Sequence, residues 1–305
     1  MPTPPLGVTA VMLPELDFDQ QIERCVELNL THYVYRPRVI ADHQRDSPYS
    51  NWGNHRFDLT PQRLADEGPQ LADRLEAAGL TPFGTVPNTA DAHDEDLFKL
   101  HLQGAAAARA ANMRIALPPL SQGLFDWAAY LAACRDTLAR MIDLAAPFDI
   151  KLVIEMHAGS PAVDPVGARN LCEGFDPQHL GLIFDLPNLS REGIRHAALS
   201  VAAAAAYIDH AHVGGFTYLP PETTSKGDSN QQPQFRGRDA DGFAEPVGTM
   251  APLTDNDLHA PTWLRLLLEA VPHCPLIIED YTPDKPATTR LTDTAAALRR
   301  ALPAD

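Results

Sequence analysis

The stretch Lys151-Leu-Val-Ile-Glu155 is a short apolar run that ends in a carboxylate, and three later stretches repeat this pattern. They are Leu180-Gly-Leu-Ile-Phe-Asp185, Tyr207-Ile-Asp-His-Ala-His212 and Pro275-Leu-Ile-Ile-Glu279. Each run has the length and composition of a buried strand, and a buried carboxylate is costly unless a partner compensates its charge. If the four ends converge, three carboxylates and one imidazole meet, and a divalent metal ion is the simplest compensating group.

Strand-like and helix-like segments alternate along the whole chain. We expect strands at 6–13, 31–36, 81–86 and 113–117, and four more that start near residues 151, 181, 208 and 276. Helices are expected at 17–28, 60–78, 94–111, 125–146, 165–172, 191–206, 261–271 and 285–302. Eight βα units in 305 residues predict a (β/α)8 TIM barrel, with residues 1–305 as a single domain.

An open doubly wound sheet is the alternative architecture. Such a fold normally carries a glycine-rich phosphate loop after its first strand. The segment at that place, Met12-Leu-Pro-Glu-Leu-Asp17, contains no glycine, which favours the barrel. Two connections are unusually long, at 37–59 and 214–257, and both follow strands. In a barrel these βα loops lie on the C-terminal face, so we expect them to cover a substrate there.

The composition argues against several classes of function. The formal net charge of −16 opposes binding to nucleic acid and to anionic membranes, because both need basic patches. No run reaches the ~18 apolar residues of a membrane span, and the first residues lack the pattern of a signal peptide. The four cysteines are widely spaced, which predicts reduced and buried thiols. We therefore expect a cytoplasmic protein.

Each strand-end acid also has an ordinary structural interpretation. An aspartate at this place can cap the following helix, and a glutamate can pair with an arginine. Four such residues at equivalent strand ends favour a shared metal site, whose oxygen-rich shell suits Mn²⁺, Mg²⁺ or Co²⁺ better than structural zinc. His210 shares its strand face with His212, so we expect a core histidine or a hydrogen-bonding residue beneath the metal ligands.

The chain resembles the xylose-isomerase-like TIM barrels, a family of sugar isomerases and epimerases. The matching pieces are Ile154-Glu155-Met-His157, Phe184-Asp185-Leu-Pro-Asn188, His210-Ala-His212-Val213 and Ile278-Glu279. The segment 252–261 is similar to the family's segment before its seventh helix, although the family's glycines are missing. The resemblance extends over nearly the whole chain in architecture, whereas its specific motifs lie in the C-terminal half.

The resemblance implies a metal-dependent enzyme. Glu155, Asp185, His212 and Glu279 would bind one divalent ion, with Mn²⁺ expected first and Mg²⁺, Co²⁺ or Zn²⁺ as alternatives. Glu155 and Glu279 would be the catalytic base and acid of an isomerase or epimerase that acts on a sugar or keto-polyol. The expected reaction abstracts a proton beside a metal-bound carbonyl and passes through an enediolate intermediate.

Substrate contacts are expected around the four ligands. His157 lies beyond Glu155, while Trp52 and His55 in the first long loop offer rings that can stack on or bond to a sugar. The alternative is that His157 is an ordinary solvated loop residue and that Trp52 only packs its loop against the barrel. The full set of expected substrate contacts is His157, Asn188, Trp52, His55 and Arg238.

Two positions depart from the pattern of the related ketose epimerases. Those proteins carry a histidine where this chain has Asn188 and a glutamate where it has Pro161. The resemblance therefore does not imply ketose 3-epimerase specificity. A further enzyme class shares the first chemical step, namely a lyase of the inosose dehydratase or keto-glycoside eliminase type, in which a leaving group departs from the enediolate.

Two more functions are compatible with the ligand types. An abasic-site endonuclease would use a three-zinc cluster with more histidines, and the negative charge of this chain opposes DNA binding. A barrel that keeps a metal only for stability, without catalysis, is the non-enzymatic alternative. We expect a small-molecule partner, no nucleic acid and no membrane, and a homo-oligomer by resemblance.

Overall fold

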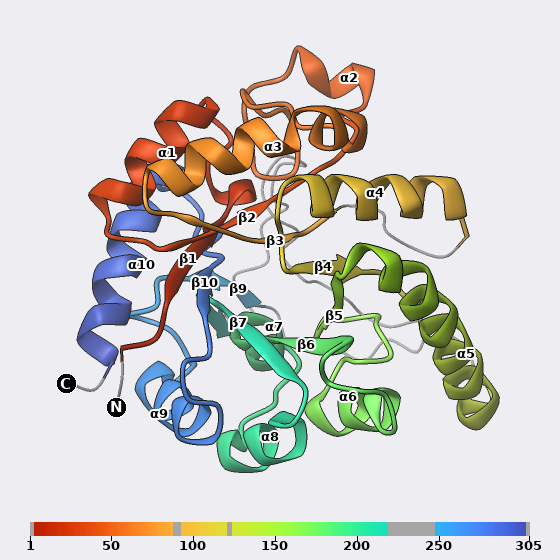
Figure 1. The fold of residues 1–305 in the computed structure, drawn as a ribbon. Helices are drawn as coiled ribbons and strands as arrows, with labels where there is room; N and C mark the ends of the chain where they lie inside the picture. Colours follow the sequence, from red (N-terminus) through yellow and green to blue (C-terminus); the bar gives the residue numbers. More distant parts are fainter. Residues whose placement is uncertain (1–2, 88–92, 121–123, 219–247, 303–305) are drawn as a thin grey trace.

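The computed structural model describes residues 3–87, 93–120, 124–218 and 248–302, whose strands close into a parallel barrel surrounded by helices (Figure 1). Around the barrel the strands follow the order β1-β10-β7-β6-β5-β4-β3-β2. This arrangement confirms the (β/α)8 barrel. The barrel strands are β1 (Leu6–Thr9), β2 (His32–Tyr35), β3 (Thr81–Thr85), β4 (Asn112–Ile115), β5 (Lys151–Glu155), β6 (Leu180–Asp185), β7 (Ile208–Val213) and β10 (Leu276–Ile278).

The helices that cover the barrel begin where the sequence supplies capping groups. Asp17 and Gln20 form a reciprocal capping box at the first helix, and Thr60 caps the second covering helix, which has Pro61 at its first position. The covering helices are α1 (Phe18–Glu27), α3 (Pro61–Ala77), α4 (Glu95–Ala107), α5 (Trp127–Ala145), α6 (Pro165–Cys172), α8 (Ala197–Ala204), α9 (Ala260–Ala270) and α10 (Ala287–Ala301).

Three segments differ from the sequence-based expectations. The first strand ends at Thr9, because a 3-10 helix, η1 (Ala10–Met12), replaces the rest of the expected strand. A second 3-10 helix, η2 (Ala146–Phe148), follows α5. The helix expected at 191–206 is shorter than predicted and corresponds to α8. A separate, unexpected helix, α7 (Leu186–Arg191), starts directly after β6. The loop at 37–59 contains a short helix, α2 (Asp42–Arg45).

The second long loop is not without structure at its ends. Strands β8 (Gly215–Tyr218) and β9 (Gly248–Ala251) pair as an antiparallel hairpin directly after β7. Gly214 joins β7 to this hairpin, and a Cβ atom there would lie 2.4 Å from the carbonyl oxygen of Glu279. Only glycine allows the chain to turn so close to the neighbouring strand end. Residues 219–247 lie outside the described part of the chain.

The main apolar core lies between the barrel wall and the helices. Leu152 and Ile154 on β5 belong to it, and so do their neighbours on β6. The residues between them on each strand face the barrel interior, where Val34, Val86 and Ile277 form a separate small cluster. Full burial of such side chains contributes about 1.5–3 kcal/mol each, so the outer core supplies most of the stability.

Two further findings concern the thiols and the membrane. All four cysteines are buried and none forms a disulfide, as the sequence predicts. Within the described ranges, no helix combines the length and the apolar character needed to cross a bilayer. The cytoplasmic location stays a prediction.

Candidate metal centre

Four side chains from four strands meet at the C-terminal end of the barrel. Glu155 ends β5, Asp185 ends β6, His212 lies in β7 and Glu279 follows β10. One ligand atom from each lies within 4.8 Å of all the others. The imidazole is central, since His212 Nδ1 lies 3.1 Å from Asp185 Oδ2, 3.4 Å from Glu155 Oε1 and 3.4 Å from Glu279 Oε2. We call this set the rim cluster.

The register of the parallel strands explains this convergence. His212 on β7 lies opposite Asp185 on β6 and opposite Ile277 on β10, and Glu155 on β5 lies opposite Ile183 on β6. The backbone N–H of Glu279 donates to the carbonyl of Val213 at 2.9 Å. The four side chains therefore stand at neighbouring levels of adjacent strands and point into the barrel mouth.

The two carboxylate oxygens of Asp185 have different partners, one at the start of α7 and one in the rim cluster. Its Oδ1 accepts the backbone N–H of Asn188 at 2.7 Å and so caps α7, whereas its Oδ2 accepts the hydrogen of His212 Nδ1. The structural role expected for a strand-end aspartate is thus present without displacing the cluster. One oxygen still faces the three other members.

Glu155 also has an arginine partner. Arg114 on β4 approaches with its Nε 2.5 Å from Glu155 Oε2. Burial alone would raise the pKa of Glu155, but the charges of Arg114 and His212 outweigh burial and hold it well below its usual range. Glu155 is therefore ionised in the folded protein, with its second oxygen directed toward His212.

The pKa values of His212 and Glu279 are shifted by burial and by the neighbouring carboxylates. Burial disfavours a charged His212, yet the carboxylates of Glu279, Asp185 and Glu155 raise its pKa well above the usual value. Burial raises the pKa of Glu279 to about 7, with Glu155 and Asp185 adding to the effect while His212 opposes it. Protons thus supply part of the positive charge that the cluster requires.

This donor set fits a divalent cation. Three carboxylates and one imidazole are the ligands that Mn²⁺, Mg²⁺ and related ions bind, and all four side chains are at most 10% exposed. Three buried carboxylates at this distance repel each other unless cations or protons balance them. Binding a metal ion in place of the protons would provide that balance.

Next to Glu279, aromatic side chains and an arginine form one wall of the site. The Tyr281 hydroxyl donates to Glu279 Oε2 at 3.3 Å, and the Tyr281 and Trp52 rings lie 5.1 Å apart. The guanidinium of the buried Arg36 lies 4.5 Å from the centre of the Trp52 ring. Trp52 remains 46% exposed, so it is accessible from solvent beside the cluster.

The first long loop is fastened to the barrel by its own polar contacts. Asn51 Nδ2 donates to the carbonyl of Val11 at 2.6 Å, and Arg290 Nη2 on α10 donates to Asn51 Oδ1 at 3.0 Å. His55 is buried and its Nε2 donates to the carbonyl of Asn51 at 3.1 Å. These contacts hold Trp52 against Tyr281 and give His55 a role in packing the loop.

The other expected substrate contacts are placed differently. His157 follows β5, is partly exposed, and directs its Nδ1 to the carbonyl of Ala158 at 2.7 Å. Asn188 is partly exposed in the first turn of α7, next to Asp185. Arg238 lies outside the described residues. Contacts between these side chains and a substrate stay predictions.

Two residues of the site, Arg114 and Tyr281, were not expected from the sequence, and both touch the rim cluster directly. An arginine inside the apolar strand Asn112-Met-Arg-Ile115 was a usable signal for Arg114, because a buried arginine needs an anionic partner. No comparable signal marks Tyr281, since an aromatic residue after a strand is ordinary.

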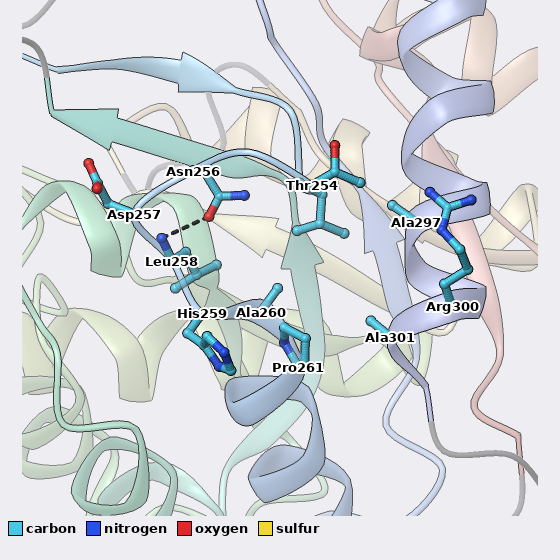
Figure 2. A pocket seen from close by; sticks show the side chains of 11 residues that line it. Thr254, Asn256, Asp257, Leu258, His259, Ala260, Pro261, Ala297, Arg300 and Ala301 are labelled. Atoms are coloured by element: carbon cyan, nitrogen blue, oxygen red, sulfur yellow. Dashed lines mark hydrogen bonds between the residues drawn. The ribbon is translucent and has the colours of Figure 1, made fainter.

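A cavity of about 540 Å³ lies elsewhere, between the segment leading into α9 and the C-terminal turns of α10 (Figure 2). Asp257, His259 and Arg300 at its border are exposed, and His259 Nδ1 is 2.8 Å from Thr262 Oγ1. Asp257 accepts from the hydroxyl of Thr217 at 2.9 Å. Local contacts account for the polar atoms of Asp257 and His259, so we do not assign catalysis to this cavity.

Comparisons with known proteins agree with the geometry. The family model described as xylose isomerase-like TIM barrel matches residues 40–301, and the chain belongs to this family. No curated protein sequence matches the chain.

Solved structures with the same fold cover nearly the whole chain. A probable 3-DHS dehydratase, AsbF, from Bacillus anthracis has a TM-score of 0.69 and 11% identity, covering 97% of this chain and 98% of that one. The 3-keto-D-glucoside 4-epimerase YcjR from E. coli has a TM-score of 0.65 and 11% identity, covering 98% and 100%. A xylose isomerase-like TIM barrel protein from Mycobacterium smegmatis, in complex with magnesium, has a TM-score of 0.60 and 18% identity, covering 99% and 98%. At these identities the likeness concerns the fold.

Proposed function

We propose that the protein is a divalent-metal-dependent isomerase or epimerase that acts on a sugar or keto-polyol. The observation that carries the proposal is the rim cluster, with three carboxylates and one imidazole within 4.8 Å at the mouth of the barrel. In TIM-barrel enzymes the active site lies at this end. Mn²⁺ is the expected ion, and the magnesium complex of a distant family member supports a hard divalent cation.

Glu155 and Glu279 are the proposed proton-transfer pair. They approach His212 from strands on opposite sides of β7, so a planar substrate intermediate between them presents one face to each carboxylate. Glu155, which Arg114 keeps ionised, would remove the proton beside the carbonyl. Glu279, whose hydrogen bond from Tyr281 fixes one oxygen, would return a proton on the other face.

The remaining residues orient the reactants. When bound, a divalent cation would polarise the substrate carbonyl and compensate the negative charge that develops on its oxygen. Arg114 adds a fixed positive charge beside Glu155, and the exposed face of Trp52 offers a surface for sugar C–H groups. His157 and Asn188 are the proposed contacts for substrate hydroxyls.

The test combines metal analysis with hydrogen exchange. We expect about one Mn, Mg, Co or Zn per chain in the purified protein, and metal-dependent incorporation of deuterium from heavy water into a keto-sugar beside its carbonyl. Asp185→Asn should lose both, although it keeps the cap of α7 because asparagine caps helices as well as aspartate. A folded protein that binds no metal even after incubation with each ion would refute the proposal.

The same experiment separates the lyase from the isomerase. Both reactions begin with removal of the same proton, so exchange alone does not distinguish them. Mass spectrometry of the product decides, because loss of water or of an aglycone identifies a lyase, whereas an unchanged mass identifies an isomerase or epimerase. The dehydratase and epimerase among the structural relatives make both outcomes chemically consistent with this fold.

A further inference from the structure

A β-bulge in β7 turns two consecutive polar residues into the barrel interior. Leu182 pairs with Ile208 and Ile183 with His210, so Asp209 is an extra residue without a partner across the sheet. Ile208 and Ala211 both belong to the outer core, which leaves Asp209 and His210 together on the inner side. Gly181 on β6 makes room, since a Cβ atom there would lie 3.0 Å from Asp209 Cβ.

These residues form a continuous polar chain beneath the rim cluster. Lys151 Nζ, from the first residue of β5, lies 2.8 Å from Asp209 Oδ1, and Asp209 Oδ2 lies 2.8 Å from His210 Nδ1. Asn112 Nδ2 donates to the same Oδ2 at 3.2 Å. Burial would raise the pKa of Asp209, but His210 and Lys151 outweigh it and lower the pKa to about 2. We call Lys151, Asp209 and His210 the floor chain.

The floor chain ends next to the proposed metal ligand. The rings of His210 and His212 have centroids 5.4 Å apart, and both side chains are at most 1% exposed. Among the described residues, the Nε2 atoms of both rings are buried and lack a hydrogen-bond partner. An unsatisfied buried imidazole nitrogen costs about 1–3 kcal/mol, so two of them in adjacent rings call for an explanation.

The tautomers of the two rings are complementary. The ionised Asp209 accepts only, so His210 Nδ1 carries a hydrogen and the Nε2 atom of neutral His210 is an acceptor. His212 faces the carboxylates with Nδ1, and a ligand nitrogen must give up its hydrogen, which leaves the hydrogen of neutral His212 on Nε2. One ring therefore offers an acceptor where the other needs one.

We propose that the floor chain positions His212 for metal binding: His210 accepts the Nε2 hydrogen of His212, directly or through one water molecule, and Asp209 and Lys151 fix the tautomer of His210. This inference rests on the proposed function, because it assigns residues that support the same metal site. Histidine ligands generally donate their second N–H to a fixed partner, and loss of that partner lowers metal affinity about 10–100-fold. Lys151, Asp209 and His210 are positioning residues in this assignment.

His210→Phe tests the proposal, and His101→Phe is its matched control. Phenylalanine preserves the ring that packs edge-on against Phe83 but removes both nitrogens. His101 on α4 is also a buried histidine, 2% exposed, and belongs to the helical layer. We expect His210→Phe to raise the Mn²⁺ dissociation constant about 10–100-fold, and His101→Phe to leave it unchanged. The constant is measured by competition with a chromophoric chelator on protein shown to be folded by circular dichroism.

A second variant and a spectroscopic measurement test the proposal even if His210→Phe fails to fold. Asp209→Asn keeps the size of the side chain but releases the tautomer of His210, and we expect about a tenfold loss of Mn²⁺ affinity. The visible spectrum of the Co²⁺-loaded protein should change in both floor-chain variants, because the imidazole ligand is no longer held in place. His101→Phe should give the wild-type spectrum.

The outcomes separate the two proposals. Wild-type affinity in folded His210→Phe, or an equal loss in His210→Phe and His101→Phe, would overturn the positioning role and leave the metal site intact. A wild-type protein that binds no ion would overturn the proposed function itself. Selective weakening in the two floor-chain variants, with one ion still bound by the wild type, is the result that we expect.

Discussion

The two ends of the barrel interior hold two buried polar clusters whose charges are balanced in different ways. In the floor chain, Lys151 faces Asp209 at 2.8 Å, so one positive and one negative charge compensate each other. In the rim cluster, three carboxylates surround one imidazole, and Arg114 touches only one of them. Protein groups balance the charges of the floor chain, whereas the rim cluster has an excess of negative groups that protons or the proposed cation would balance. This difference supports the proposal that the rim is the functional end.

The titration of the two clusters reflects the same contrast. The partners of Asp209 lower its pKa to about 2, so its carboxylate stabilises the fold above pH 3.8 and loses that effect only as the pH falls toward 2. Burial raises the pKa of Glu279 to about 7, so its ionisation destabilises the metal-free fold as the pH rises. Four experiments can test this contrast between the floor chain and the rim cluster.

Lys151→Met removes the positive half of the floor chain. We expect the free energy of unfolding to fall by about 3 kcal/mol, the lower end of the cost of breaking a buried ion pair, because Lys151 is 23% exposed. Lys285 forms an ion pair of the same length with Asp293 on the surface, so Lys285→Met should have a much smaller effect than Lys151→Met. Urea denaturation measures both, and equal costs would contradict a charge-matched floor.

Addition of a divalent ion should stabilise the rim alone. At a hundredfold excess over its dissociation constant, Mn²⁺ should raise the free energy of unfolding by about 2.7 kcal/mol. Asp185→Asn should abolish this gain, yet the metal-free variant should be at least as stable as the wild type because one repelling charge is gone. Calorimetry with and without the ion checks both statements, and a destabilised metal-free variant would argue against charge excess at the rim.

The pH dependence of the metal-free protein should identify Glu279. Its pKa is 4.5 in the unfolded chain and about 7 when folded, so the stability it contributes is present below pH 4.5 and is lost as the pH rises through 7. Glutamine does not ionise, so Glu279→Gln should exceed the wild type at pH 8 by on the order of 2 kcal/mol and match it near pH 4.5. If the free energies of unfolding of metal-free wild type and Glu279→Gln differ by the same amount at every pH, the assignment of this pH dependence to Glu279 is wrong.

Gly181→Ala probes how tightly the floor is packed. The added methyl group would lie 2.7 Å from Lys151 Cε, and because that side chain can shift, we expect a cost of only about 1 kcal/mol. The cost should shrink when Lys151→Met is already present, since the two positions are in contact. A double-mutant cycle measures the coupling, and strictly additive costs would show that the glycine serves another purpose.

The rim cluster was predictable because its signals are local. Each ligand follows a short apolar run, and parallel strands in a closed barrel bring their C-terminal ends together whatever the loops do. The alternation of side chains also placed Val153, Ile183 and Ile277 on the inner side beneath the ligands, and all three are fully buried. Capping residues such as Asp17 and Thr60 fixed where helices begin.

Other contacts join residues that no local pattern connects. Asn51 and Arg290 are 239 residues apart, and their hydrogen bond ties the loop that carries Trp52 to α10. The short helix α7, directly after β6 and before the expected helix, likewise has no clear signal in helix propensity. Such contacts depend on how the closed barrel brings distant segments together.

By itself, the sequence determined the alternation of strands and helices, the closed barrel and the four residues at the strand ends. Periodicity and short-range composition carry that information, because burial must repeat with the geometry of each element. The tertiary structure alone decided that Asp209 faces inward, since strict alternation would place it opposite to His210. A one-residue bulge reverses that side-chain direction, and such a bulge depends on the register against β6 rather than on the residues of β7.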